Sequence, residues 1–255
     1  MAAALVGFGC SPATVTAPKL GLKPARSAAW MIDGAVRVWG SSSGHMELVI
    51  SSEADFCVRW TDLRVARGAA SEAYREAIAD LEPAAESPED PRVCAAYAEF
   101  LEGIEPEVKA LNPPGSWRIV LVPSDSVQDA LRTQSDAVVD EPENTNRWLD
   151  LIPERNQISA AVASAPRWDF RGFLDLVEDE WDAAEVAGAV CDGEPPEVAS
   201  TLHFSEGELH LRVPETDRVN FRLSDVLLYD EDDPEVDHGG LNANGHFPLC
   251  DLSGL

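Results

Sequence analysis

Strand-like runs of apolar residues dominate the pattern of the chain. The clearest is Trp117 to Val122, an apolar run with one arginine that Pro123 ends, as expected of a buried strand. Asp33-Gly34 favours a two-residue hairpin turn, and the runs beside it predict paired strands within 28–39, with Trp30 opposite Arg37. The same reasoning predicts further strands at residues 45–50, 157–164, 170–177, 185–191, 200–205, 208–213, 218–228 and 241–249.

A middle segment shows helical periodicity instead. One helix is predicted to begin at Ser71, a good capping residue, and to stop before Pro83. A second is predicted to begin at Asp90-Pro91, a cap followed by a first-turn proline. The apolar faces carry Tyr74, Ala77, Ile78 and Leu81 in the first helix and Val93, Tyr97, Phe100, Leu101 and Ile104 in the second.

Together these elements predict one α+β or mainly-β domain over residues 28–255. Antiparallel strands at this density pack as a sandwich or an open barrel, and the two helices form an insertion at about residues 68–111. Residues 1–27 show no periodicity and are expected to form a flexible arm.

The chain is strongly acidic, which narrows the choice of partners. It has 46 Asp and Glu against 19 Lys and Arg, a formal charge of −27. Such a surface repels phosphate backbones, so we expect no nucleic-acid partner. Hydrophobic residues make up 45% of the chain, the usual share for a folded globular protein.

The first ten residues form a short apolar run, residues 2–9, that ends at Cys10. The run is far shorter than the roughly 20 residues that span a bilayer. It resembles the end of a bacterial lipoprotein signal peptide, in which the cysteine is lipidated and becomes the mature N-terminus. Gly9 fits the position before that cysteine, whereas Gly7 stands where Leu, Val or Ile is usual, and no basic residue precedes the run. A start codon assigned too far downstream accounts for the missing basic region, and the alternative is a frayed cytosolic N-terminus with a chance cysteine.

The remaining cysteines are even in number and spread along the chain. No CxxC spacing indicates zinc or a redox dithiol, so they predict two disulfides in an oxidising compartment. Three connectivities are open, and the position of one cysteine five residues from the C-terminus favours a terminal staple, Cys57 with Cys250. The alternative is four buried thiols in a reducing cytosol. The four cysteines that remain besides Cys10 are Cys57, Cys94, Cys191 and Cys250.

Two segments, residues 186–192 and 243–251, each place a glycine before a Cys-Asp pair. Residues 243–251 resemble the closing strand, with a glycine, an aromatic residue and a cysteine, of uncharacterised secreted bacterial lipoproteins. Their opening half carries a strand, a Ser-Ser pair and a cysteine, as residues 48–52 and Cys57 do here. The resemblance covers the β-rich ends and leaves the helical insertion uncovered. It implies an envelope β-sheet protein of unknown activity and supplies no catalytic residues.

Two histidines form the most specific candidate for metal chemistry. If Glu206-Gly207 is a two-residue turn, His203 lies opposite His210 with their Cβ atoms roughly 5 Å apart. With Glu208 nearby, this set of ligands could hold a transition metal. The alternative, which we favour, is a polar stripe that faces solvent.

A run of carboxylates at residues 230–237 is a further candidate, for calcium, because calcium prefers hard oxygen ligands. The EF-hand spacing fails, since no glycine or closing glutamate stands where the loop needs one. A solvated acidic loop is the favoured alternative. The candidate calcium ligands are Asp230, Asp232 and Asp233.

Other motifs indicate little chemistry. Residues 40–44 match G-x-S-x-G, which would make Ser42 a nucleophile, but a strand rather than a helix is predicted to follow, so a loop is the better interpretation. No P-loop, GxGxxG or HExxH motif is present. The chain has seven tryptophans, and some of them could stack on a glycan.

The sequence therefore predicts a non-enzymatic lipoprotein of the cell envelope. It would be anchored to a membrane through lipid on Cys10, face the periplasm or the cell surface, need no cofactor, and bind a protein or a glycan. The alternatives are a cytosolic acidic interaction module and an envelope enzyme that depends on calcium or a transition metal.

Overall fold

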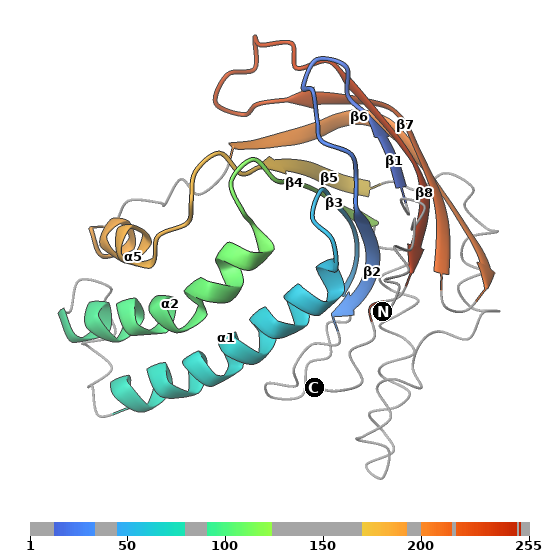
Figure 1. Ribbon diagram of the computed structural model, residues 1–255. Helices are drawn as coiled ribbons and strands as arrows, with labels where there is room; N and C mark the ends of the chain where they lie inside the picture. The colour runs from blue at the N-terminus through green and yellow to red at the C-terminus, as the bar shows by residue number, and fades with distance from the viewer. Residues whose placement is uncertain are drawn as a thin grey trace, which may run out of the picture.

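A curved antiparallel sheet forms the body of the protein. The computed structural model describes residues 13–33, 45–79, 91–123, 170–192, 200–215, 218–248 and 250. In these residues eight strands form one sheet in the order β1-β8-β7-β6-β5-β4-β3-β2, which curls into a nearly closed barrel (Figure 1). The strands are β1 (Ala13–Thr16), β2 (Ser27–Asp33), β3 (His45–Ser51), β4 (Trp117–Pro123), β5 (Phe170–Leu176), β6 (Ser200–Glu215), β7 (Arg218–Tyr229) and β8 (Gly240–Pro248).

The barrel nearly closes because the chain at and after β8 reaches the opposite edge strand, β2. From β2 to β8 each strand pairs with the next one along the chain, whereas β1 pairs with β8. At the other edge, the backbone N–H of Cys250 donates a hydrogen bond of 3.0 Å to the carbonyl of Trp30 in β2. The two ends of the described chain therefore meet at one seam.

The main core fills the inside of this barrel. Alternate residues of each strand point inward, as the period of two requires, and Phe221 and Phe247 stack with ring centroids 4.0 Å apart. The connection between β1 and β2 adds Ala17, Leu20 and Ala25 to the same cluster. The prediction of a flexible arm is therefore wrong for residues 13–27, because β1 pairs with β8 and the connection packs in the core. The largest core side chains with almost no exposure include Trp30, Leu48, Ile50, Ile119, Leu121, Leu174, Leu202, Leu209, Leu223 and Leu241.

Three helices form an arm that projects from one side of the barrel (Figure 1). We call α1 (Phe56–Ile78), α2 (Pro91–Leu111) and α5 (Ala183–Cys191) the helical arm. The start of α1 and the end of α2 pack on the outer face of the sheet, while a separate apolar cluster joins the helices to one another. The described residues contain no helix that is both long and apolar enough to cross a membrane.

These features confirm the predicted α+β, mainly-β class with antiparallel strands and helices inserted between two of them. The second predicted helix is confirmed as α2, and the strand from Trp117 as β4. The predicted strands at 45–50, 170–177, 218–228 and 241–249 are also present, with bounds that differ by one or two residues. The predicted strand at 157–164 lies outside the described residues.

The prediction that Asp33 is a turn residue of a tight hairpin is wrong. The strand β2 pairs with β3, with Asp33 opposite His45 and Trp30 opposite Leu48. Trp30 therefore has a core leucine as its cross-strand neighbour, and Arg37 lies outside the described residues. Asp33 is therefore the last residue of a strand rather than part of a turn, and Gly34 lies outside the described residues.

The predicted start of the first helix is also wrong. The helix α1 begins at Phe56, so Ser71 lies within it rather than at its cap. The first half of α1 escaped prediction because its apolar pattern is weak and Phe56 is its one buried residue among those described. Contacts of Phe56 and Trp60 with the outer face of the sheet stabilise this part of the helix.

The predicted strand at 185–191 is a helix. The carboxylate of Asp182 accepts a hydrogen bond of 2.9 Å from the backbone N–H of Glu185, which caps the first turn of α5. The spacing of Asp182 and Glu185 is that of a capping box, a helix-start signal in the sequence. The similar sequences at residues 186–192 and 243–251 therefore differ in structure, because the first belongs to the helix α5 and the second begins in the strand β8.

The two predicted strands at 200–205 and 208–213 form one continuous strand, β6. Pairing with β7 shifts register between Phe204 and Glu206 and again between Glu206 and Glu208. Gly207 lies at this irregularity with a φ of 138°. The shift offsets the alternation of side chains, so Leu202 and Leu209 both face the core although seven residues separate them.

Candidate functional site

One pair of cysteines ties the helical arm to the barrel. The sulfurs of Cys57 and Cys250 lie at bonding distance, with Cα atoms 5.4 Å apart and a sequence separation of 193. Cys57 is in the first turn of α1, and Cys250 follows β8 at the seam. Both pack in the cluster on the outer face of the sheet, where Cys250 is 3% exposed. This is the pairing that the position of Cys250 favours in the sequence.

The other pair lies within the helical arm. Cys94, in the first turn of α2, is at bonding distance from Cys191, the last residue of α5, and their Cα atoms are 5.8 Å apart. The bridge spans 97 residues of sequence. The cysteines other than Cys10 are thus arranged as two long-range disulfides, while Cys10 itself lies outside the described residues.

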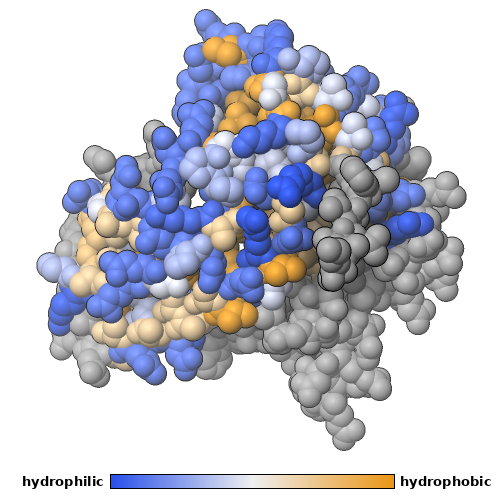
Figure 2. All heavy atoms as spheres, viewed as in Figure 1, coloured by the Kyte–Doolittle hydropathy of each residue, from blue (hydrophilic) through white to orange (hydrophobic). Residues whose placement is uncertain are grey.

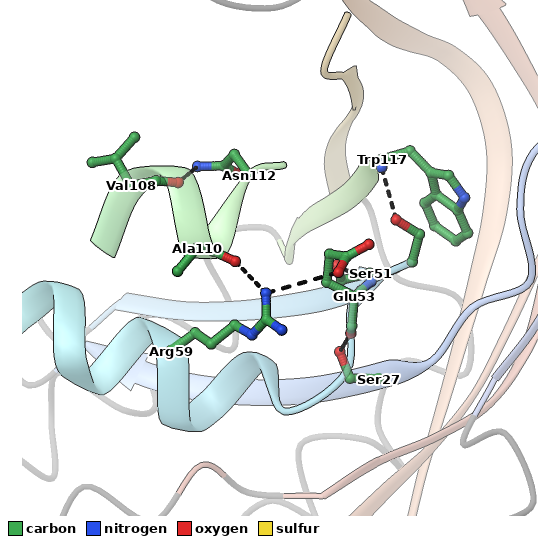
Figure 3. Close-up of polar contacts among 9 residues, drawn as sticks. Ser27, Ser51, Glu53, Arg59, Val108, Ala110, Asn112 and Trp117 are labelled. Atoms are coloured by element: carbon green, nitrogen blue, oxygen red, sulfur yellow. Dashed lines mark hydrogen bonds and ion pairs between the residues drawn. The ribbon is translucent and has the colours of Figure 1, made fainter. Parts of the chain in front are cut away.

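The junction between sheet and helical arm is polar and well bonded (Figure 3). The guanidinium of Arg59 in α1 donates to the carbonyl of Ala110 at the end of α2, and it lies 3.8 Å from the carboxylate of Glu53. In the close-up these groups converge on the turn that leads from β3 into α1. The contacts link both long helices to the sheet at one point.

The Ser-Ser pair noted in the sequence belongs to this junction. The hydroxyl of Ser51 accepts a hydrogen bond from the N–H of Glu53, and that of Ser52 accepts one of 2.9 Å from the N–H of Trp117. Both serines are buried. In the described structure they therefore serve the geometry of the turn, because each hydroxyl satisfies a backbone donor that has little access to water.

The structure does not bring His203 and His210 together. In the continuous strand β6, His203 pairs with Tyr229 and His210 with Arg222. Seven residues of extended chain place the two imidazoles roughly 20 Å apart. His210 Nε2 lies 3.2 Å from Glu208, and His203 Nε2 lies 3.8 Å from Glu231. The predicted opposition of the histidines is wrong because a bulge replaces the turn.

The acidic run after β7 is an exposed loop. The carboxylate of Asp230 accepts a hydrogen bond from the N–H of Asp232, and that of Asp237 accepts one from Gly239. In the part of the chain that the structure describes, no three His, Cys, Asp or Glu side chains gather in a way that could hold a metal ion. The proposed ligands Asp230, Asp232 and Asp233 thus lie in one loop without forming such a group, and calcium binding stays a prediction.

A lysine near the N-terminus binds this loop. The ammonium of Lys19 lies 2.6 Å from the carboxylate of Asp237 and donates to the carbonyl of the same residue. The hydrogen bond from Lys19, with another from the N–H of Gly239, lowers the pKa of Asp237. No pattern in the sequence points to this pair, because 218 residues separate its members.

The helical arm carries an apolar surface that reaches solvent. A hollow of about 320 Å³ lies between α1 and α2 and is lined mostly by alanines, with Tyr74, Phe100, Glu99 and Gly103. Val58 and Val65 of α1 are 61% and 56% exposed. Figure 2 shows a band of apolar and weakly apolar side chains along the lower edge of the helical arm. This is a surface that a binding partner could cover.

The four tryptophans that the structure describes are buried or partly buried. Trp30, Trp117 and Trp181 are buried, and the indole of Trp117 donates to the carbonyl of Lys23. Trp60 is partly buried beneath the guanidinium of Arg64 at 4.9 Å. Ser42 and the tryptophans Trp39, Trp148 and Trp168 lie outside the described residues.

Comparisons with protein-family models, with curated proteins and with solved structures find no match for the chain.

Proposed function

We propose that this protein is a lipoprotein of the bacterial cell envelope that acts by binding. The observation that carries the proposal is the pairing of Cys57 with Cys250 and of Cys94 with Cys191. Bridges between cysteines so far apart in sequence persist in an oxidising compartment and are rare in the cytosol. Such pairing supports export of the chain.

The N-terminal sequence supports an anchor for the exported chain. Residues 2–9 form an apolar run that ends at Gly9-Cys10, as in the lipoprotein signal peptides that it resembles. Lipid on Cys10 would hold the barrel at a membrane surface, with residues 11 and 12 and β1 as the link. A single acyl chain gives only reversible membrane binding, so stable attachment needs more than one chain.

The helical arm supports a binding role. Its exposed valines and the hollow between α1 and α2 give an apolar surface on an element that projects from the barrel. The negative charge of the chain, −27, disfavours nucleic acid and favours a protein or a neutral partner.

The experiment that tests the proposal is fractionation of cells from the native host that carry either the natural chain or Cys10→Ser. We expect the natural chain in the membrane fraction, from which detergent releases it, and Cys10→Ser in a soluble fraction. Ser11→Ala is the matched control, because it alters the neighbouring residue and keeps the cysteine. A natural chain that is recovered from the cytosol would contradict the proposal and support the cytosolic acidic module.

A further inference from the structure

The two disulfides lie in different surroundings. The Cys57–Cys250 bridge packs among apolar side chains that include Phe56 and Met31. Cys250 is 3% exposed, whereas Cys57 is partly exposed. The Cys94–Cys191 bridge joins the start of α2 to the end of α5, far from the sheet (Figure 1), and both of its cysteines are partly exposed. An attacking thiolate can therefore reach either sulfur of the Cys94–Cys191 bridge but only one sulfur of the other, and the rate of thiol–disulfide exchange depends on access to the sulfur.

The two ends of α5 are held in different ways. At its N-terminal end, the carboxylate of Glu105 in α2 accepts a hydrogen bond of 3.3 Å from the N–H of Ala183. The ammonium of Lys109 lies 3.1 Å from Glu105 and 3.0 Å from Glu180. At its C-terminal end, the disulfide at Cys191 joins α5 to the first turn of α2.

Apolar packing between α5 and the rest of the arm is modest. The buried residues of α5 are Ala183 and Ala187, and an alanine side chain removes little apolar area from water. Trp181, which precedes the helix, contributes the largest buried side chain of this cluster, beside Leu101 and Ile104 of α2. Trp181 and the polar contacts of Glu105 and Lys109 hold the N-terminal end of α5, and Ala187 is its buried residue nearest the C-terminal end.

Ion pairs also hold the N-terminal end of α5. Carboxylates are frequent around the start of α5 and on α2, and Lys109 lies close to one from each group, Glu180 and Glu105. The carboxylates are Glu178, Asp179, Glu180, Asp182 and Glu185 around the start of α5, and Glu99, Glu102, Glu105 and Glu107 on α2.

We propose that the Cys94–Cys191 disulfide is a redox-sensitive clasp, which opens before Cys57–Cys250 and frees the C-terminal end of α5 from α2. A dithiol reductant supplies the two electrons and two protons. One of its thiolates attacks a sulfur of the bridge and forms a mixed disulfide, and its other thiol then displaces the protein sulfur. The products are two cysteine thiols in the protein and one disulfide in the reductant.

Opening changes the surface of the helical arm and leaves the barrel intact. With the C-terminal end of α5 released, the first half of α2 loses the cover of that end, while Trp181 continues to pack beside Leu101 and Ile104. Lys109 and Trp181 keep the N-terminal end of α5 in place as the pivot. The clasp therefore controls how much apolar surface the arm presents, whether or not Cys10 carries lipid.

The test uses the oxidised full chain and dithiothreitol, with alkylation of new thiols and peptide mass spectrometry at successive times. We expect Cys94 and Cys191 to be alkylated about tenfold faster than Cys57 and Cys250, because access limits the attack. Hydrogen exchange measured on the same samples should accelerate in residues 183–191 and in the first half of α2. Exchange in β3 and β4 should stay slow.

Two double variants serve as a matched pair. Cys94→Ser/Cys191→Ser should show the fast exchange of α5 without reductant, while Cys57→Ser/Cys250→Ser should keep α5 protected until dithiothreitol is added. Equal alkylation rates at the two bridges, or an α5 that stays protected after Cys94 is alkylated, would overturn the proposal.

Discussion

At the scale of single residues, buried hydroxyls decide how β3 turns into α1. Ser52 is 1% exposed, and its hydroxyl is the acceptor for the N–H of Trp117. Its own backbone N–H donates to the carbonyl of Trp117 in return. The hydroxyl of Ser52 thus supplies an acceptor for the N–H of Trp117, while the backbone of Ser52 supplies the donor for the carbonyl of Trp117.

We expect Ser52→Ala to destabilise the protein by about 1–3 kcal/mol, because it leaves a buried N–H without an acceptor. Urea unfolding followed by tryptophan fluorescence measures the change. Ser205→Ala is the control, since the hydroxyl of Ser205 is exposed and donates only a long hydrogen bond of 3.4 Å to Leu227. Equal stability losses in the two variants would show that Ser52 has no special role at the turn.

The sequence identifies few of these residue-scale contacts. It points to the Ser-Ser pair but to no partner, because Ser52 and Trp117 are 65 residues apart. It predicts His203 opposite His210 because Glu206-Gly207 suits a turn as well as a bulge. Both alternatives put Leu202 and Leu209 on the core side, so the hydrophobic pattern does not distinguish them.

At the scale of elements, the strands follow from local pattern and the helices only in part. Trp117 to Val122 is identifiable as a strand because it is apolar and short, and proline ends it. The helix α5 was missed because Val186 and Val190 suggest a strand, although Asp182 and Glu185 have the spacing of a capping box. The first half of α1 has no such signal in its sequence, because this part of the helix is stabilised by contacts with the sheet rather than by a local capping or apolar pattern.

The bulge in β6 gives a prediction at this scale. A Cβ atom on Gly207 would lie 2.6 Å from Val226 Cγ2 and 3.0 Å from Val226 Cα, and the φ of Gly207 is 138°. We therefore expect Gly207→Ala to destabilise the protein by about 1–3 kcal/mol.

The matched variant is Gly188→Ala in α5, where a Cβ atom meets nothing within 4 Å. Alanine favours the helix over glycine, so this variant should be more stable by up to about 1 kcal/mol. Thermal unfolding of both variants measures the effects. A Gly207→Ala protein as stable as the natural chain would contradict the close approach of Gly207 to Val226 at this bulge.

The ion pair between Lys19 and Asp237 predicts that the stability of the protein depends on pH. The folded-state pKa of Asp237 is lowered from 3.8, chiefly by the hydrogen bond from Lys19. The carboxylate therefore contributes to stability above pH 3.8, and the contribution is lost as the pH falls through the lowered pKa. Carboxyl NMR titration should show the pKa of Asp237 moving back toward 3.8 in Lys19→Gln.

Lys23→Gln is the control for this titration, because Lys23 lies beside Gly115 rather than beside the acidic loop. It should leave the pKa of Asp237 as in the natural chain. An Asp237 pKa that is the same in Lys19→Gln and in the natural chain would contradict the ion pair.

At the scale of the whole molecule, two covalent bridges join parts of the chain that the sequence separates widely. Cys57–Cys250 holds the helical arm at the barrel seam, and Cys94–Cys191 closes the arm itself. In the chain-entropy model, closing loops of about 100 residues or more stabilises a fold by roughly 4–5 kcal/mol each. A protein built this way owes much of its stability to these disulfides.

The measurement that tests this account most directly is the intact mass of the protein purified from its native host, before and after reduction and alkylation. We predict a chain that begins at Cys10, heavier than its sequence by the mass of attached acyl groups, with four cysteines that react with the alkylating agent only after reduction. A chain without added lipid, whose cysteines all react before reduction, would contradict both the anchor and the export of the protein.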